Sequence, residues 1–474
     1  MRVLLINPPA ENTVSANIPQ VVEKERGYTP PLGLLYIASY LKKSARHDVR
    51  VLDALLENIG QEGVKDYLLS FKPQVVGITT LSLTIIDVIN TVNTVKAVNS
   101  EIKVVLGGPH PHLFPEETIN LPGVDFVVLG EGEVTFYELI ESIEKGKEPL
   151  DVKGLAFKKN GRTAFTGERA LCDNLDEIPF PARELVNYKK YYSSIATKTP
   201  ITTMITSRGC PYQCSFCDRP HLGKKFRART ARNVVDEMEI CQEMGINEIL
   251  FYDDTFTVDR QRVLDICEEI LRRKLKVFWD IRSRVNTVDE KMLEMLSRAN
   301  CKRIHFGVEA GTKKIIEVLN KGITLEQVNQ AFNDSKKAGI STLAYFMIGN
   351  PGETLDDIME TINLSIKLNP DYVLFSILVP YPGTRLYVEG LKEGIIREDY
   401  WKKFAESPYK GFIPEYWNEK FTREKLEALV VFAYKRFYAR FPYLIKQFIK
   451  TRSLGELRRK IKAGWKIIKI KKKL

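Results

Sequence analysis

The chain has 474 residues, of which 44% are hydrophobic and 28% charged, and its formal net charge is +11. This length predicts two or three globular domains with enough apolar material for their cores. The seven cysteines lack the paired spacing of secreted disulfide proteins, no signal peptide is evident, and no apolar run reaches the roughly 18 residues that cross a bilayer. We therefore expect a cytoplasmic protein and exclude secreted and membrane-spanning classes.

The first 145 residues alternate short apolar strands with helical patterns of apolar residues. This alternation is typical of a doubly wound parallel α/β sheet, which binds ligands at the carboxyl ends of its strands. The strands are predicted at 3–6, 49–53, 75–79, 103–106 and 126–129.

Small and polar residues gather where these predicted strands end. Glycines let the backbone approach a ligand closely, and hydroxyl groups supply hydrogen bonds without charge. Any flavodoxin-like sheet also needs glycines for its turns, so the ends alone do not identify a ligand. The candidate residues are Asn7, Pro8, Thr80, Ser82, Gly107, Gly108, His110, Gly130, Glu131 and Gly132.

A second series of strands and helices follows a connector. Residues 146–195 hold a hairpin-like stretch and a proline-rich segment, which predict a link between domains. Six strand and helix units within 196–395 then predict a partial TIM-type barrel, (βα)6, whose site lies at the carboxyl ends of its strands. These strands are predicted at 202–206, 248–252, 277–282, 303–308, 342–348 and 372–378.

Cys210, Cys214 and Cys217 follow the first strand of this second series, in the run SRGCPYQCSFCDRP. A closed zinc or iron–sulfur site normally takes four protein ligands. Three cysteines at CxxxCxxC spacing leave one iron of a [4Fe–4S] cluster open to a small molecule. A zinc knuckle or structural cysteines are the alternative. We expect ordinary buried thiols at the dispersed Cys172, Cys241, Cys267 and Cys301.

This motif, with Phe216 before its last cysteine, resembles the signature of the radical S-adenosylmethionine (SAM) superfamily. With the sheet domain upstream, roughly the first 390 residues resemble the cobalamin-binding radical SAM enzymes, which include C-methylases and the anaerobic magnesium-protoporphyrin cyclase. The resemblance implies a flavodoxin-like cobalamin domain at 1–145 and a radical SAM barrel at 196–395. Its implied cofactors are a [4Fe–4S] cluster, SAM and cobalamin.

The chain departs from many cobalamin proteins at one loop. The DxHxxG sequence that gives cobalt an axial histidine is missing, since residues 53–60 read DALLENIG. His110 and His112 lie in another loop, where we favour hydrogen-bonding or structural roles over cobalt ligation. The lower axial ligand of cobalt is therefore left open.

The resemblance also implies roles for the ends of the barrel strands. A carboxylate at the second strand would contact the SAM amino group, in place of the usual glycine-rich motif. An arginine at the third strand would pair with the SAM carboxylate, with a surface ion pair as the alternative. A glutamate at the fourth would hold the ribose. Gly349 and Pro351 would flank adenine or methionine, although turn chemistry explains them equally well. The implied SAM residues are Asp253, Asp254, Arg282 or Arg284, Glu309, Gly349, Pro351 and Phe216. We expect Tyr252, Tyr345 and Tyr381 to pack the barrel, with contact to the substrate as the alternative.

The implied reaction is reductive cleavage of SAM to a 5′-deoxyadenosyl radical, hydrogen abstraction from an unactivated carbon, and methylation of that carbon. It implies an external electron donor such as flavodoxin or ferredoxin. Radical cyclisation is the alternative within the family, and a cobalamin or cluster sensor without catalysis is an alternative of another class. Methylthiotransferases share the barrel but carry further cysteines in an N-terminal domain. This chain has none before Cys172, which argues against that class.

Residues 396–474 predict a helical cap that ends in a basic amphipathic tail. Residues 441–474 hold twelve Lys or Arg and a single acid, Glu456, so the tail carries the whole positive excess. Leu, Ile and Trp465 between lysines are typical of a segment that lies on an anionic membrane, and a solvated tail or nucleic-acid contact are the alternatives. We predict peripheral contact with the inner membrane face and a small-molecule, lipid or isoprenoid substrate, without nucleic-acid binding.

Overall fold

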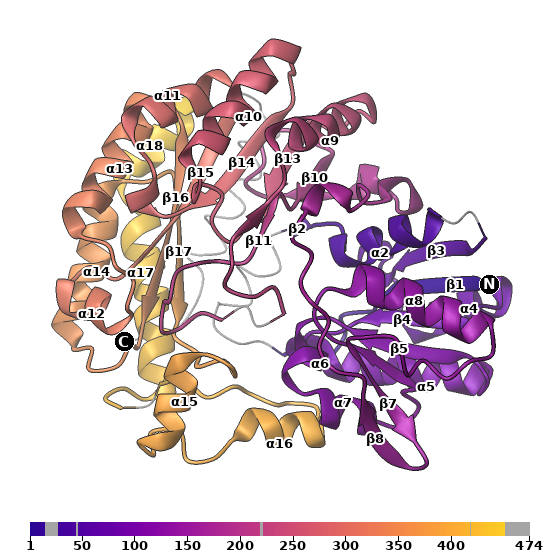
Figure 1. Ribbon diagram of the computed structural model, residues 1–474. Coiled ribbons are helices and arrows are strands. Elements are labelled where there is room, and N and C mark those ends of the chain that lie inside the picture. Colours follow the sequence, from indigo (N-terminus) through magenta and orange to yellow (C-terminus); the bar gives the residue numbers. More distant parts are fainter. Residues whose placement is uncertain (15–26, 44–45, 219–220, 418, 451–474) are drawn as a thin grey trace.

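The computed structural model describes residues 1–14, 27–43, 46–218, 221–417 and 419–450. Two sheets dominate it (Figure 1). The first, indigo to magenta, faces the second, magenta to orange, and helices surround both. Each strand predicted above is present, with its ends shifted by at most two residues.

The first sheet has seven strands in the order β3-β1-β4-β5-β6-β7-β8. The five strands of the doubly wound part are parallel, and their apolar residues are buried on both faces, as such sheets require. Helices α2 (Leu32–Lys42) and α8 (Gly132–Glu144) cover one face, and α4 (Gln61–Phe71) and α5 (Ile85–Val98) cover the other. The parallel strands are β1 (Arg2–Asn7), β3 (Asp48–Asp53), β4 (Val75–Thr79), β5 (Lys103–Gly107) and β6 (Phe126–Val128).

Part of the predicted connector extends this sheet. Strands β7 (Leu155–Lys159) and β8 (Arg162–Phe165) form a hairpin, and β7 pairs antiparallel with β6. The chain then runs through short turns to the barrel. A two-stranded ladder of β2 (Gly27–Tyr28) and β9 (Tyr192–Ser193) joins the end of that stretch to the N-terminal domain.

The second sheet confirms the predicted partial barrel. Its six strands are all parallel, in the order β10-β13-β14-β15-β16-β17. They are β10 (Ile201–Met204), β13 (Glu248–Phe251), β14 (Phe278–Ser283), β15 (Cys301–Glu309), β16 (Ser341–Ile348) and β17 (Tyr372–Ile377). The outer ring in Figure 1 includes α9 (Ala231–Glu243), α10 (Arg260–Arg273), α11 (Glu290–Arg298), α13 (Leu325–Lys337) and α14 (Leu355–Leu368).

The open edge of the barrel is covered by helix α17 (Arg423–Tyr438). The hydroxyl of Tyr434 accepts from the backbone N–H of Phe375 and donates to its carbonyl, each at 3.1 Å. Tyr438 does the same for Val373 at 3.0 Å. Two tyrosines thus satisfy backbone N–H and carbonyl groups of the edge strand β17, which would otherwise be free to pair with another chain.

Three more helices complete the C-terminal part that the structure describes. These are α15 (Arg385–Lys392), α16 (Tyr400–Glu406) and α18 (Phe441–Lys450). Helix α16 approaches α7 (Pro115–Asn120) of the first domain, where Lys402 and Glu117 lie 3.8 Å apart. None of the described helices combines the length and apolar character needed to cross a membrane.

Candidate functional site

A cavity of about 320 Å³ lies at the carboxyl ends of the barrel strands. Polar residues from several strand ends and the cysteine loop converge on it, as expected for a TIM-type site. Its lining includes Cys210, Cys214, Phe216, Cys217, Asp254, Arg282 and Glu309. The structure thus brings these seven predicted residues together.

The cysteines lie on a loop that is fixed at its base. Strands β11 (Ser207–Arg208) and β12 (Arg227–Ala228) pair antiparallel and close the loop between them. Gly209 has φ +82°, and a Cβ there would lie 2.2 Å from the carbonyl oxygen of Lys225, so only glycine fits. The backbone N–H of Ser215 donates to the carbonyl of Leu319 at 3.0 Å, which anchors the middle of the loop to the barrel.

The three cysteines suit a cluster better than a single metal ion. Cys210 and Cys214 are half-buried and Cys217 is exposed, and all three line the cavity without a fourth cysteine among its described residues. Burial raises the pKa of Cys241 to about 11 and that of Cys267 to about 12, which disfavours the thiolate needed for metal binding. A three-thiolate loop over a cavity fits an iron–sulfur cluster with one open iron.

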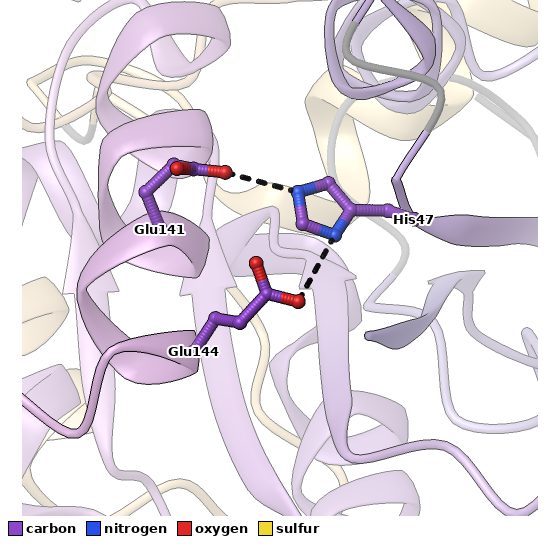
Figure 2. A group of neighbouring side chains, drawn as sticks. All are labelled: His47, Glu141 and Glu144. Carbon is purple, nitrogen blue, oxygen red and sulfur yellow. Dashed lines mark hydrogen bonds and ion pairs between the residues drawn. The ribbon is translucent and has the colours of Figure 1, made fainter.

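A different group, His47, Glu141 and Glu144, has ligand atoms that all lie within 4.8 Å of one another (Figure 2). The His47 ring approaches Glu141 through Nε2 at 3.3 Å and Glu144 through Nδ1 at 4.0 Å. Its two nitrogens therefore serve different carboxylates and do not converge on one point. Arg46 lies 2.7 Å from Glu141, and the N-terminal amine 3.2 Å from Glu144, so this group is an ion-pair cluster that joins the N-terminus and the residues before β3 to α8.

The two aspartates after β13 have different positions. Asp254 lines the cavity. Asp253 is buried and accepts hydrogen bonds of 2.6 Å from the backbone N–H and hydroxyl of Thr206 and from the hydroxyl of Ser207. The structure therefore places Asp253 under the turn that leads into the cysteine loop, away from the residues that line the cavity.

Arg282 and Arg284 at the end of β14 both line the cavity. The Arg282 guanidinium lies 3.8 Å from the centre of the Tyr252 ring and donates to the carbonyl of Phe251 at 2.5 Å. Arg284 points instead to the cysteine loop, where its Nη1 lies 3.4 Å from the Sγ of Cys214. The two arginines thus face different groups.

Glu309 has a backbone conformation that is unusual for a glutamate. Its φ is +70°, at an irregularity in the pairing of β15 with β16. Its carboxylate accepts from Nζ of Lys321 at 2.8 Å, and a Cβ on Gly307 would lie only 2.3 Å from its Oε1. Strained backbone of this kind persists where the surroundings hold it, often at functional sites.

Sequence reasoning missed His305, which also lines the cavity. Burial lowers its pKa to about 4, so the ring is neutral near pH 7. Its Nε2 lies 3.3 Å from a carboxylate oxygen of Asp280 and 3.3 Å from Nε of Arg303, and its Nδ1 hydrogen-bonds the hydroxyl of Tyr345 at 2.8 Å. Alternation along β15 could have found His305, because residues 305, 307 and 309 point to the same face of a strand. Tyr345 lines the cavity as well, whereas packing was expected.

Gly349 and Pro351 are not among the residues that line the cavity. Gly349 has φ +79°, and its backbone N–H donates to Oε2 of Glu353 at 2.6 Å. Burial raises the pKa of Glu353 to about 7. These residues form the turn after β16.

The predicted cobalamin residues meet at the carboxyl edge of the first sheet. Gly108 has φ +117°, and a Cβ there would lie 2.9 Å from the carbonyl oxygen of Thr80, so the loops after β4 and β5 touch. Ser82 bonds Nδ1 of His110 at 2.9 Å, while the buried Nε2 of His110 has no hydrogen-bond partner among the described residues. Burial lowers the pKa of His110 to about 4. A polar atom left unsatisfied beside close-packed loops fits a site that holds a further group.

The rest of this edge serves other contacts. Asn7 donates to Asp53 at 2.7 Å, and Pro8 is buried beside it in the chain. Burial lowers the pKa of His112, whose ring centre lies 6.5 Å from that of His221. A Cβ on Gly107 or Gly130 would meet no atom closer than 3.8 Å, so there is open space beside both residues. A Cβ on Gly132 would approach the Ile37 side chain at 3.3 Å.

Glu131 binds the barrel. Its Oε1 lies 3.1 Å from Arg208 and 2.8 Å from Arg227, the facing residues of the β11 and β12 ladder. Glu133 lies 2.5 Å from Arg208. All four side chains are buried, so this ion-pair network joins the edge of the first sheet to the base of the cysteine loop.

The sequence matches two family models. The Radical SAM superfamily model covers residues 204–365, and the B12 binding domain model covers residues 20–140. An uncharacterized methyltransferase of Pyrococcus horikoshii is 37% identical over 450 residues, which are 94% of each chain. The anaerobic magnesium-protoporphyrin IX monomethyl ester cyclase of Rubrivivax gelatinosus is 29% identical over 98% of this chain and 83% of its own.

Two solved structures share the fold. TsrM of Kitasatospora setae, a radical SAM methyltransferase with cobalamin and a [4Fe–4S] cluster bound, aligns with a TM-score of 0.69 and 19% identity over 83% of this chain and 78% of its own. OxsB, with aqua-cobalamin and SAM bound, aligns with a TM-score of 0.65 and 21% identity. The alignment covers 85% of this chain and 56% of OxsB. The family models, the relatives and the two facing domains agree. This chain belongs to the cobalamin-dependent radical SAM enzymes, and its cofactors are a [4Fe–4S] cluster, SAM and cobalamin.

Proposed function

We propose that this enzyme methylates an unactivated carbon of a small organic substrate. The observation that carries this proposal is the cavity at the cysteine loop, whose base is bound to the cobalamin edge of the first sheet through Glu131. A radical site and a methyl donor must lie close together for such a transfer. The methyltransferase names among the relatives support the same conclusion.

When bound, the cluster supplies the electron that cleaves SAM, and cobalamin carries the methyl group. Cys210, Cys214 and Cys217 would hold the cluster. Arg282 faces the cavity and is suited to the SAM carboxylate, while Glu309, held by Lys321, is suited to the ribose hydroxyls.

His305 and Tyr345 would position a polar group of SAM or substrate. Asp280 and Arg303 hold the ring of His305 through Nε2, and its Nδ1 hydrogen-bonds the Tyr345 hydroxyl at 2.8 Å. The Tyr345 hydroxyl lines the cavity, where it can hydrogen-bond a polar group of a ligand. A proton acceptor is not needed for methyl transfer to a carbon radical, so the role is one of orientation.

The products of SAM test this function. Protein reconstituted anaerobically with iron, sulfide and cobalamin is given SAM, dithionite and a small-molecule and lipid extract of the source cells. We expect 5′-deoxyadenosine and S-adenosylhomocysteine together. Deoxyadenosine alone would favour the cyclisation chemistry of the Rubrivivax relative, and the lack of both products would contradict radical catalysis.

We infer that a flavodoxin or ferredoxin supplies electrons in the cell, through the loop that carries the exposed Cys217.

We also propose that helix α18 rests on an anionic membrane. Phe441, Leu444, Ile445 and Phe448 lie at helical spacing on one face and are 74%, 51%, 43% and 67% exposed. Tyr443 is buried on the other side. The stretch that follows, 451–474, lies outside the described residues, and its sequence is rich in Lys and Arg, which favour anionic lipid surfaces. A lipid or isoprenoid substrate could be taken from that surface.

Replacing Phe441 and Phe448 together with serine should abolish sedimentation with vesicles that contain phosphatidylglycerol, because the apolar face would no longer enter the interface. Phosphatidylcholine vesicles should bind the unchanged protein weakly. The matched control replaces Val388 and Ile413, which are 60% and 59% exposed elsewhere. Equal sedimentation of both double variants would contradict the role of α18.

A further inference from the structure

Arg284 is a buried cation whose hydrogen bonds within the described part of the chain include no carboxylate. Its side chain is 5% exposed, and its guanidinium lies 3.9 Å from the centre of the Tyr212 ring. Nε donates to the side-chain oxygen of Asn286 at 3.2 Å, and Nη2 donates to the carbonyl of Lys321. The remaining contact is that of Nη1 with the Sγ of Cys214 at 3.4 Å.

Two other buried arginines near this site, Arg208 and Arg303, are neutralised by carboxylates. Arg208 lies 2.5 Å from Glu133, and Arg303 lies 2.6 Å from Asp280. A buried charge is costly unless an opposite charge compensates it. Of the groups that accept from Arg284, the Cys214 sulfur is the one that can carry a negative charge, as a thiolate. The arginine is therefore placed as the counter-ion of that cluster ligand.

We propose that Arg284 raises the reduction potential of the cluster through its N–H hydrogen bond to the sulfur of Cys214. Reduction transfers one electron from the external donor to the cluster, with no bond or proton exchanged, and adds one negative charge. A cation that donates to a ligand sulfur stabilises the reduced state more than the oxidised one, because hydrogen bonds to sulfur and local charge set cluster potentials. This separates the two arginines of β14, with Arg282 left for the SAM carboxylate.

The inference rests on cluster binding by the cysteine loop and not on methylation. It holds equally for a methylase and for a cyclase. The absence of methylated product would therefore leave it intact, and a failed redox test would leave the methylation proposal intact.

The test is an anaerobic redox titration of the reconstituted full-length enzyme without SAM, followed by the paramagnetic signal of the reduced cluster. Arg284→Gln should lower the midpoint potential by at least about 59 mV, which is a tenfold loss in the one-electron reduction equilibrium. Arg284→Lys keeps the charge but not the fork of donors, so its midpoint potential should lie between those of the unchanged enzyme and Arg284→Gln. Arg282→Gln is the matched control, because it removes the same charge from the same cavity without touching a sulfur, and it should shift the potential less.

SAM affinity, measured in parallel by equilibrium binding, decides between the two roles. A potential unchanged in Arg284→Gln, with weakened SAM binding, would overturn the proposal and make Arg284 the partner of the SAM carboxylate. Iron content shows whether each variant retains its cluster. If Arg284→Gln loses its cluster, the midpoint potential of Arg284→Lys decides. A midpoint potential below that of the unchanged enzyme supports the proposal, and an equal or higher one contradicts it.

Discussion

Replacing Cys214 with alanine is expected to abolish cluster retention and to reduce 5′-deoxyadenosine formation below detection. Three thiolates on one loop hold the cluster, and no fourth cysteine among the described residues of the cavity can take the place of a lost one. The loss of one ligand also leaves Arg284 without its sulfur partner. Iron content after anaerobic reconstitution and the amount of deoxyadenosine formed from SAM measure the effect.

The matched control for this variant is Cys172→Ala. Cys172 is half-buried and free, and its Sγ donates to the carbonyl of Asn174 at 3.2 Å, away from the cavity lining. Its removal should leave the iron content unchanged. A Cys214 variant that retained full iron and cleaved SAM at the normal rate would contradict the assignment of the cluster ligands.

The architecture could be predicted from the sequence because its strands are short, apolar and regularly spaced. The run VLLI in β1 is fully buried, as a strand in the middle of a parallel sheet must be, and polar or glycine residues mark where the strand ends. The position of the cluster site could also be predicted from a local pattern. Its three cysteines lie within one loop, so no contact between distant segments had to be known.

Contacts between segments distant in the chain could not be predicted. Glu131 was expected at the cobalamin edge, but its carboxylate is paired with Arg208 and Arg227, which lie more than 70 positions away. His305 could be assigned to a strand, yet its role depends on Asp280 and Tyr345 from two neighbouring strands. Such partners follow from packing, and local sequence patterns do not indicate which carboxylate meets which cation.

Replacing Glu131 with glutamine is expected to destabilise the protein by about 3 kcal/mol, the cost of breaking a buried ion pair from one side. Arg208 and Arg227 face each other across the β11 and β12 ladder, so without Glu131 two buried cations are left with Glu133 alone. The base of the cysteine loop would then shift relative to the cobalamin edge. Because radical formation needs only the cluster and SAM in the barrel, whereas methyl transfer needs both domains, we expect more 5′-deoxyadenosine per S-adenosylhomocysteine.

Urea unfolding and the ratio of the two SAM products measure these effects of the Glu131 variant. Glu62→Gln is the control, since that carboxylate is 88% exposed and pairs with Lys65 at 3.5 Å, a surface contact worth at most about 1 kcal/mol. Adding Arg227→Gln to Glu131→Gln should cost less than the sum of the single changes, because the two side chains act as a pair. Full additivity, together with a product ratio equal to that of the Glu62 variant, would show that this ion pair does not couple the two domains.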